Sequence, residues 1–192
     1  EVEAAPAGPA NDEIWYTNGS TTEATTPNNT NGFGANIISN TYDSTKNCWV
    51  IKFDGDVTTI GGSAFADCSS LTSITIPNSV TEIEILAFFG CSSLTSVTIP
   101  SSVTLIGEQA FETYSSLTSV YYNGDISAWC KIDFYDSASN PLWNNAKLYI
   151  NNTEVTEVTI PSDISEISYA FSGCSSLTSV TIPDSVTSIG EE

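Results

Sequence analysis

Residues 68–90 read CSSLTSITIPNSVTEIEILAFFG, residues 91–111 read CSSLTSVTIPSSVTLIGEQAF, and residues 174–190 return as CSSLTSVTIPDSVTSIG. The first two segments begin 23 residues apart, at positions 68 and 91. The same spacing separates the members of four apolar sets: Val57, Val80 and Val103; Phe65, Phe88, Phe111 and Phe134; Leu71, Leu94 and Leu117; Ile60, Ile83, Ile106 and Trp129. Four registers that share one period indicate an internal repeat.

Each repeat opens with an alternating apolar segment. Ile74 and Ile76 lie two residues apart, as in a strand with one buried face, and Pro77 ends that strand because it has no N–H to donate. From Val80 to Phe88 the spacing is no longer two-fold, which suits a turn or a short second strand. One such coil cannot bury its own apolar side, so the sequence predicts a mainly β solenoid in which like residues of neighbouring coils stack.

The repeat unit resembles a known family. The pattern C-S-S-L-T-S-[VI]-T-I-P-x-S-V-T-x-I-G-x-x-A-F is similar to the BspA-like leucine-rich repeats of bacterial surface proteins, over roughly residues 48–192. The resemblance implies a leucine-rich-repeat solenoid with a parallel strand array on one face. It also implies a secreted or lipid-anchored protein, and some members of the family act as adhesins.

The coils are predicted at 48–70, 71–93, 94–116, 117–154 and 155–176, with a partial coil from 177. In the first, Ile51 and Phe53 take the places of Ile74 and Ile76. The fourth keeps Trp129 in an isoleucine position, which predicts a core residue, and then runs about 15 residues too long. This insertion, near 135–154, contains an Asn-rich segment at 151–154 that indicates a hairpin.

Both ends of the chain depart from the repeat. Residues 1–11 (EVEAAPAGPAN) are typical of a flexible tether, and residues 12–47 are predicted to form a non-repeat, β-rich N-terminal cap. The solenoid, expected over 48–192, stops in mid-repeat. Further repeats are therefore expected beyond it.

The charge balance narrows the partners. The chain has 23 Asp and Glu against four Lys and Arg, a net charge of −19. Nucleic acid is excluded because its binding needs many basic residues, and anionic lipid is disfavoured for the same reason. No run of about 18 apolar residues is present, so no transmembrane segment is expected.

The sequence offers little for catalysis. Histidine is absent, which removes Ser-His, Cys-His and His-metal chemistry. Cys68, Cys91 and Cys174 share one repeat position and are predicted to pack as small apolar side chains. Cys48 and Cys130 lie off that position and would be reactive only if exposed. We expect no enzyme activity, no cofactor and no metal site, with the Asp54-Gly55-Asp56 step interpreted as a solvated turn.

Two groups of residues are candidates for binding. The first is the hydroxyl array beside the buried strand residues: Ser73, Thr75, Ser96 and Thr98. The second is the aromatic group of the irregular coil, because irregular insertions on a rigid array commonly carry binding: Tyr121, Tyr135, Trp143 and Tyr149. Core filling and a merely soluble face are the competing interpretations of these groups.

The leading hypothesis is an exported, extracytoplasmic interaction module that binds a protein of a host or neighbouring cell without catalysis. The resemblance to adhesin-bearing surface proteins supports it. One alternative is glycan binding through the aromatic insertion. Another is a structural spacer that holds a further domain away from the cell.

Overall fold

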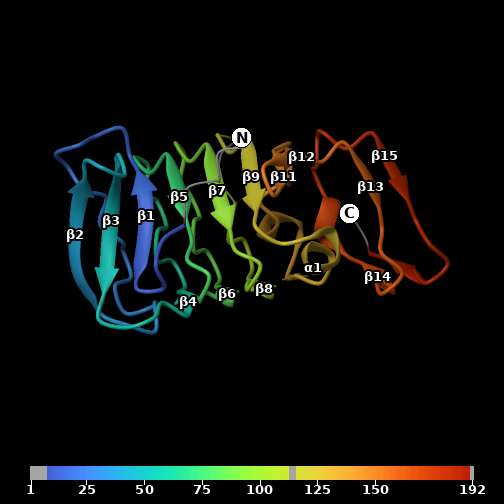
Figure 1. The fold of residues 1–192 in the computed structure, drawn as a ribbon, viewed down its shortest axis with the longest axis horizontal. Coiled ribbons are helices and arrows are strands. Elements are labelled where there is room, and N and C mark those ends of the chain that lie inside the picture. Colours follow the sequence, from blue (N-terminus) through green and yellow to red (C-terminus); the bar gives the residue numbers. More distant parts are fainter. Residues whose placement is uncertain (1–7, 113–115, 191–192) are drawn as a thin grey trace.

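The computed structural model describes residues 8–112 and 116–190 and shows a mainly β solenoid with an N-terminal cap (Figure 1). Its main sheet has eight strands in the order β12-β11-β9-β7-β5-β1-β3-β2. The bounds of these strands are β1 Glu13–Thr17, β2 Ile37–Asp43, β3 Cys48–Phe53, β5 Ser73–Thr75, β7 Ser96–Ile99, β9 Ser119–Tyr122, β11 Lys147–Ile150 and β12 Thr153–Glu154.

The return side of each coil adds a second, four-stranded sheet in the order β10-β8-β6-β4. Its strands are β4 Thr59–Ile60, β6 Glu82–Ile83, β8 Leu105–Ile106 and β10 Asp133–Phe134, and all pair in parallel. In the main sheet β5, β7 and β9 also pair in parallel, with Ile74, Val97 and Val120 aligned. The predicted period of the solenoid is therefore confirmed on both sides of these coils.

The core between the two sheets is a continuous stack of like side chains. The rings of Phe65, Phe88 and Phe111 stack at centroid distances of 5.5 and 5.1 Å. Phe33 of the cap packs edge-on against Phe65 at 5.9 Å and is fully buried. Each fully buried side chain of this size stabilises the fold by about 1.5–3 kcal/mol.

Threonine hydroxyls fasten one coil to the next. The amide and the Oγ1 of Thr95 both donate to the carbonyl oxygen of Thr72, at 2.9 and 3.0 Å. Thr118 bonds the carbonyl of Thr95 in the same way, at 3.0 and 3.2 Å. The recurring threonine before each strand thus satisfies backbone groups and leaves the next outward positions free for other contacts.

Replacing Thr95 by valine is expected to lower the free energy of unfolding by about 0.5–1 kcal/mol, because one hydroxyl bond is lost at constant shape. Thr98→Val is the matched control, since the Thr98 hydroxyl has no hydrogen bond within the described residues. Urea denaturation followed by circular dichroism measures both. Equal losses in the two variants would contradict the assigned role.

Strand β1 of the cap is part of the main sheet, and its position there shows that one predicted strand register was wrong. Ile51 and Phe53 were expected to stack on Ile74 and Ile76, but β1 lies between β3 and β5 and pairs antiparallel with both. Ile14 faces Ile51 and Tyr16 faces Ile74. The buried Ile14 and Tyr16 supply the matching apolar face, so β1 occupies the place next to the second coil.

A loop of the cap takes the place of a preceding coil, because it contacts the first coil through the backbone in the way that one coil contacts the next. The backbone N–H of Asn28 donates to the carbonyl of Ala64 at 2.8 Å. Gly32 and Gly61 approach so closely that a Cβ on Gly61 would lie 2.4 Å from the Cα of Gly32. Residues 1–7 of the expected tether lie outside the described residues, whereas the carbonyl of Asn11 already accepts the amide of Val57 at 2.8 Å.

In the fourth coil the predicted register of the return strand was also wrong. Phe134 of β10 pairs with Ile106 of β8, so it occupies the isoleucine position that was assigned to Trp129. The short helix α1 (Ile126–Cys130), whose N-cap Asp125 accepts the amide of Ala128, adds five residues before β10. Trp129 is fully buried as predicted, but it enters the core from α1 and not from a return strand.

The chain then turns back on itself. β11 and β12 form an antiparallel hairpin, as the Asn-rich segment predicted, with Asn151 and Asn152 at φ of 49° and 64°. Positive φ at both central residues is typical of a two-residue type I′ hairpin turn, and asparagine tolerates it. The short 3-10 helix η1 (Ser137–Ser139) lies between β10 and β11. The additional length of this region is therefore divided between α1 and the hairpin.

The last coils form separate two-stranded sheets, β13-β15 and β14-β16, at the right of Figure 1. Their elements are β13 Glu157–Thr159, β14 Glu166–Ile167, the 3-10 helix η2 (Tyr169–Phe171), β15 Ser179–Thr181 and β16 Ser188–Ile189. Within the described residues no strand pairing joins them to the larger sheets. Side chains span the joint instead: Trp129 Nε1 donates to the carbonyl of Ala170 at 2.6 Å and Asn140 Nδ2 to that of Tyr169 at 2.5 Å.

Candidate functional site

The outer face of the main sheet carries two rows of side chains in strand register. One row crosses five neighbouring strands from β1 to β11: Trp15, Thr75, Thr98, Tyr121 and Tyr149. The next row is hydroxyl-rich and ends in a lysine: Thr17, Ser73, Ser96, Ser119 and Lys147. Adjacent strands lie about 4.8 Å apart. The two rows therefore form a flat, rigid surface of partly exposed polar and aromatic groups.

Tyr121 and Tyr149 form an aromatic pair at one end of this surface. Their rings stack at a centroid distance of 4.9 Å with an interplanar angle of 24°. Both side chains are only partly buried. Beside them Lys147 Nζ lies 2.9 Å from Glu154 Oε1 across the hairpin. The structure thus brings together six of the eight predicted site residues: Ser73, Thr75, Ser96, Thr98, Tyr121 and Tyr149.

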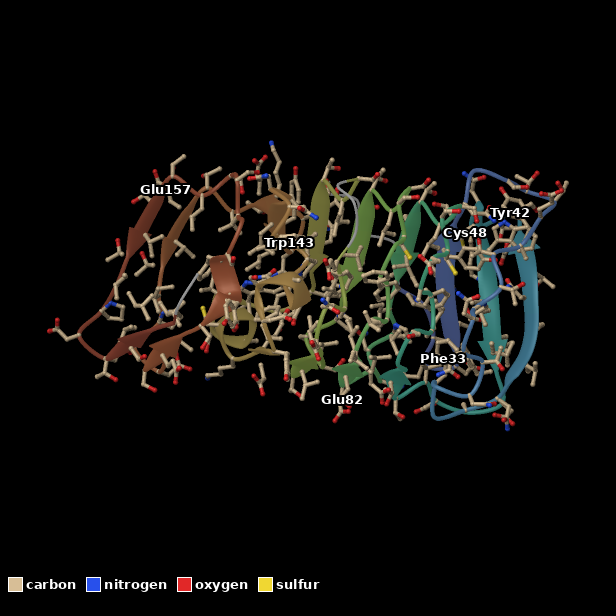
Figure 2. The ribbon with its side chains drawn as sticks, turned by 180° about the vertical axis from the view of Figure 1, so that it is seen from behind. Phe33, Tyr42, Cys48, Glu82, Trp143 and Glu157 are labelled. Atoms are coloured by element: carbon tan, nitrogen blue, oxygen red, sulfur yellow. The ribbon has the colours of Figure 1, made fainter. Side chains whose placement is uncertain are left out.

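The other two predicted residues lie elsewhere. Tyr135 follows β10 on the return side, with 68% of its side chain exposed. Trp143 is half-buried near the middle of the molecule in Figure 2, where Gly173 of the last coils packs against its backbone. The aromatics of the irregular coil therefore do not gather into one patch.

Trp15 is the residue that sequence reasoning placed in the cap without assigning it to this face. Glu13, Trp15 and Thr17 alternate with the buried Ile14 and Tyr16, so the two-residue period of β1 was the available signal. The Trp15 side chain lies at the opposite end of the surface from the tyrosine pair. It borders a hollow formed with the turn between β2 and β3.

All four lysines of the chain are paired with carboxylates. Lys46, Lys52, Lys131 and Lys147 each form an ion pair with a carboxylate. The hydrogen bond from Lys46 holds the pKa of the Asp43 carboxyl well below its ordinary value, and the same bond raises the pKa of Lys46. Other carboxylates, such as that of Glu82 at the edge of the solenoid in Figure 2, point to solvent. The protein thus presents a net negative surface with its few cations neutralised.

Four of the five cysteines are buried with a raised thiol pKa. Burial raises the pKa of the Cys91 thiol to about 12 and those of Cys68 and Cys130 to about 11. Cys91 packs as predicted and its Sγ donates to the carbonyl of Phe65 at 2.9 Å. Cys174 is only partly buried, and Cys48 is buried at the start of β3, near Tyr42 in Figure 2. A thiolate, which is the reactive form, is disfavoured at Cys68, Cys91 and Cys130.

Two further properties of the described residues concern metal binding and membrane crossing. No group of three or more His, Cys, Asp and Glu side chains in 8–112 and 116–190 is arranged to hold a metal ion. Over the same residues no helix is long and apolar enough to cross a membrane.

Comparisons with known proteins identify the repeat. A family model described as BspA type leucine rich repeat region matches residues 35–140 and 145–192, with six copies. Among solved structures, a leucine rich repeat protein of T. pallidum is similar, with 24% sequence identity and a TM-score of 0.45 over 72% of this chain and 70% of that one. No curated protein matches the chain.

Two further solved structures are similar over part of their length. A leucine rich cell surface protein from Faecalibacterium prausnitzii is 33% identical, with a TM-score of 0.39 over 70% of this chain and 35% of that one. A leucine-rich repeat protein from Bacteroides ovatus is 30% identical, with a TM-score of 0.36 over 68% of this chain and 30% of that one. The chain spans about a third of the length of these two relatives.

Proposed function

The chain belongs to the BspA-type leucine-rich repeat family, and from this premise we propose that it is an extracytoplasmic interaction module, exported or held at the cell surface, that binds a protein partner without catalysing a reaction. Stacked repeats of this kind form extended surfaces on which partners bind. A partner on a host or neighbouring cell fits the adhesin-like role. The chain contributes shape and side-chain contacts, and the partner need supply no cofactor.

The tyrosine pair on the outer face is the observation that carries this proposal. Tyr121 and Tyr149 come from adjacent parallel strands and stack on each other, so their orientation is fixed before a partner arrives. Preorganised aromatic side chains lose little conformational entropy on binding, and tyrosine is enriched among the residues that dominate protein interfaces. The Thr98 hydroxyl on the neighbouring strand, and that of Thr75 one strand further, offer hydrogen bonds to a partner.

Glycan capture by the irregular coil is less well supported as the main activity. Tyr135 and Trp143 lie apart from Tyr149, so these three side chains cannot contact one small ligand together. A purely structural spacer predicts that no protein binds. That prediction separates the spacer from the interaction module in the same experiment.

The test is a binding screen with the 192-residue chain against immobilised extracellular-matrix proteins and bacterial surface proteins. For a partner found there, the double change Tyr121→Ala with Tyr149→Ala is expected to weaken binding by about tenfold or more, as for truncation of interface aromatics. Biolayer interferometry gives the dissociation constants. Tyr135→Ala is the control, because it removes an exposed tyrosine from the return side and should leave the affinity unchanged.

Two outcomes would contradict the proposal. Absence of binding to every protein on the screen would favour the spacer. Binding that Tyr135→Ala weakens as much as the double variant would place the interface on the return side. Thermal unfolding of each variant, followed by circular dichroism, verifies that the loss does not come from unfolding.

A further inference from the structure

A hollow lies on the outer face at the end remote from the tyrosine pair. It has a volume of about 450 Å³ and is bordered by β1, β5 and the turn that joins β2 to β3. Small-molecule sites commonly measure about 300–1,000 Å³. The hollow is therefore large enough for one or two sugar rings and too small for a folded partner.

Trp15 forms a fixed aromatic wall of this hollow. Its Nε1 donates to Glu13 Oε2 at 2.8 Å, and the Lys46 ammonium lies 5.2 Å from its ring centroid. These contacts hold a partly exposed indole on a rigid strand in one orientation. An indole ring has a negative face that attracts C–H groups, such as those on one face of a pyranose ring. A sugar can therefore stack only on the ring face that the Lys46 ammonium does not cover.

The remaining lining is rich in groups that both donate and accept hydrogen bonds. Thr17 Oγ1 lies 2.6 Å from Ser73 Oγ, and Thr75 adds a further hydroxyl two residues along β5. The Asn47 side chain lines the hollow as well; its Oδ1 accepts from the Tyr42 hydroxyl at 2.6 Å. The amide nitrogen of Asn47 keeps two donors for a ligand. Such a set matches the rim of hydroxyls on a sugar.

The charges around the hollow cancel in pairs. Lys46 Nζ lies 2.8 Å from Asp43 Oδ2, and Lys52 Nζ lies 3.3 Å from Asp12 Oδ2 and 3.5 Å from Glu13 Oε1. No cation is left to select an acidic group, and the net charge of −19 repels anions over the whole molecule. The ligand that fits is consequently neutral.

We propose that this hollow is a saccharide-binding site that takes a neutral pyranose, stacked on Trp15 and hydrogen bonded to Thr17, Ser73, Thr75 and Asn47. The site is separate from the tyrosine pair and does not depend on a protein partner binding there. A peptide side chain is the competing occupant, and the experiment distinguishes it.

The experiment probes the 192-residue chain against immobilised neutral oligosaccharides: glucans, mannans, galactans and oligomers of N-acetylglucosamine. At least one class is expected to bind. Trp15→Ala is expected to weaken that binding by about tenfold or more, whereas Trp15→Phe, which keeps an aromatic face, should stay within about threefold of the unchanged chain. Binding should also be equal in about 50 mM and 500 mM salt, since no net charge takes part.

The matched control is the double change Tyr121→Ala with Tyr149→Ala, which should leave saccharide binding intact even if it abolishes binding to a protein. Circular dichroism verifies that Trp15→Ala keeps the fold. Four results would overturn the proposal: no neutral saccharide bound, binding unaffected by Trp15→Ala, binding that falls steeply with salt, or a peptide array bound in place of the glycans.

Discussion

Replacing Trp129 by alanine is expected to lower the free energy of unfolding by about 4 kcal/mol, in the range for truncation of a large buried aromatic. Trp129 is fully buried and packs against Tyr122 at a centroid distance of 5.1 Å and Phe134 at 5.5 Å. The change also leaves the carbonyl of Ala170 without its donor. A buried acceptor that loses its partner adds about 1–3 kcal/mol to the cost.

The location of Trp129 predicts more than a loss of stability. It joins α1 to the last coils across a joint that no described strand pairing spans. Without it the last coils should unfold before the rest. Trp143 lies against Gly173 at the joint and contributes to the tryptophan fluorescence together with Trp15 and Trp49. In urea, this fluorescence should therefore show an early phase at a lower concentration than the main change in far-ultraviolet circular dichroism. Two separated transitions would show that unfolding is no longer two-state.

Trp129→Phe and Tyr135→Ala are suitable controls. Phenylalanine keeps one aromatic ring but loses the N–H and the second ring of the indole, so a smaller loss of about 2–3 kcal/mol is expected. Tyr135 is exposed, and its removal should change stability by less than about 0.5 kcal/mol. If Trp129→Ala kept one transition and lost less than Trp129→Phe, the assigned role of the side chain would be wrong.

The regular part of this fold could be predicted from sequence because the side chains that stack between coils recur with a fixed period. Ile60, Ile83 and Ile106 lie where the spacing predicted, since each parallel strand pair aligns equivalent residues. The same is true of the ring stack from Phe65 to Phe111. Periodicity predicts such contacts well, because a shift by one residue would turn the buried face outward.

The 23-residue spacing predicted the wrong register in the fourth coil, because the chain gains residues there but keeps its apolar pattern. Trp129 and Phe134 lie 23 residues after Ile106 and Phe111, yet α1 inserts five residues and moves Phe134 into the isoleucine position. An aromatic at both positions concealed the shift. The place of β1 was hidden for another reason: strand pairing between distant segments depends on the whole sheet, and the 23-residue spacing of Ile51 from Ile74 suggested direct stacking instead.

The candidate surface was partly predictable. The outward hydroxyls follow from the two-residue period of each strand, and the structure brings them together with Tyr121 and Tyr149. Trp15 was missed because its strand had no known neighbour. Tyr135 and Trp143 were grouped with Tyr149 by closeness in sequence, whereas β10 and the hairpin lie on different sides of the solenoid.

Phe88→Ala is the second change with a large expected effect, again about 4 kcal/mol. Phe88 is fully buried between Phe65 and Phe111, so its removal opens a cavity with aromatic walls on both sides. The neighbouring coils are fixed by strand pairing and threonine bonds and cannot collapse to fill it. In a solenoid each coil is stabilised mainly by its neighbours, so a central defect also weakens the coupling between the two halves.

Phe89→Ala is the matched control for this prediction. Phe89 follows Phe88 in the chain and is only partly buried, outside the ring stack. Its removal should lower the free energy of unfolding by about 1 kcal/mol, close to the average for single substitutions. Urea denaturation followed by circular dichroism compares the two. Equal losses would mean that the phenylalanine stack contributes no more than ordinary surface contacts, and that the strand ladders alone hold the coils together.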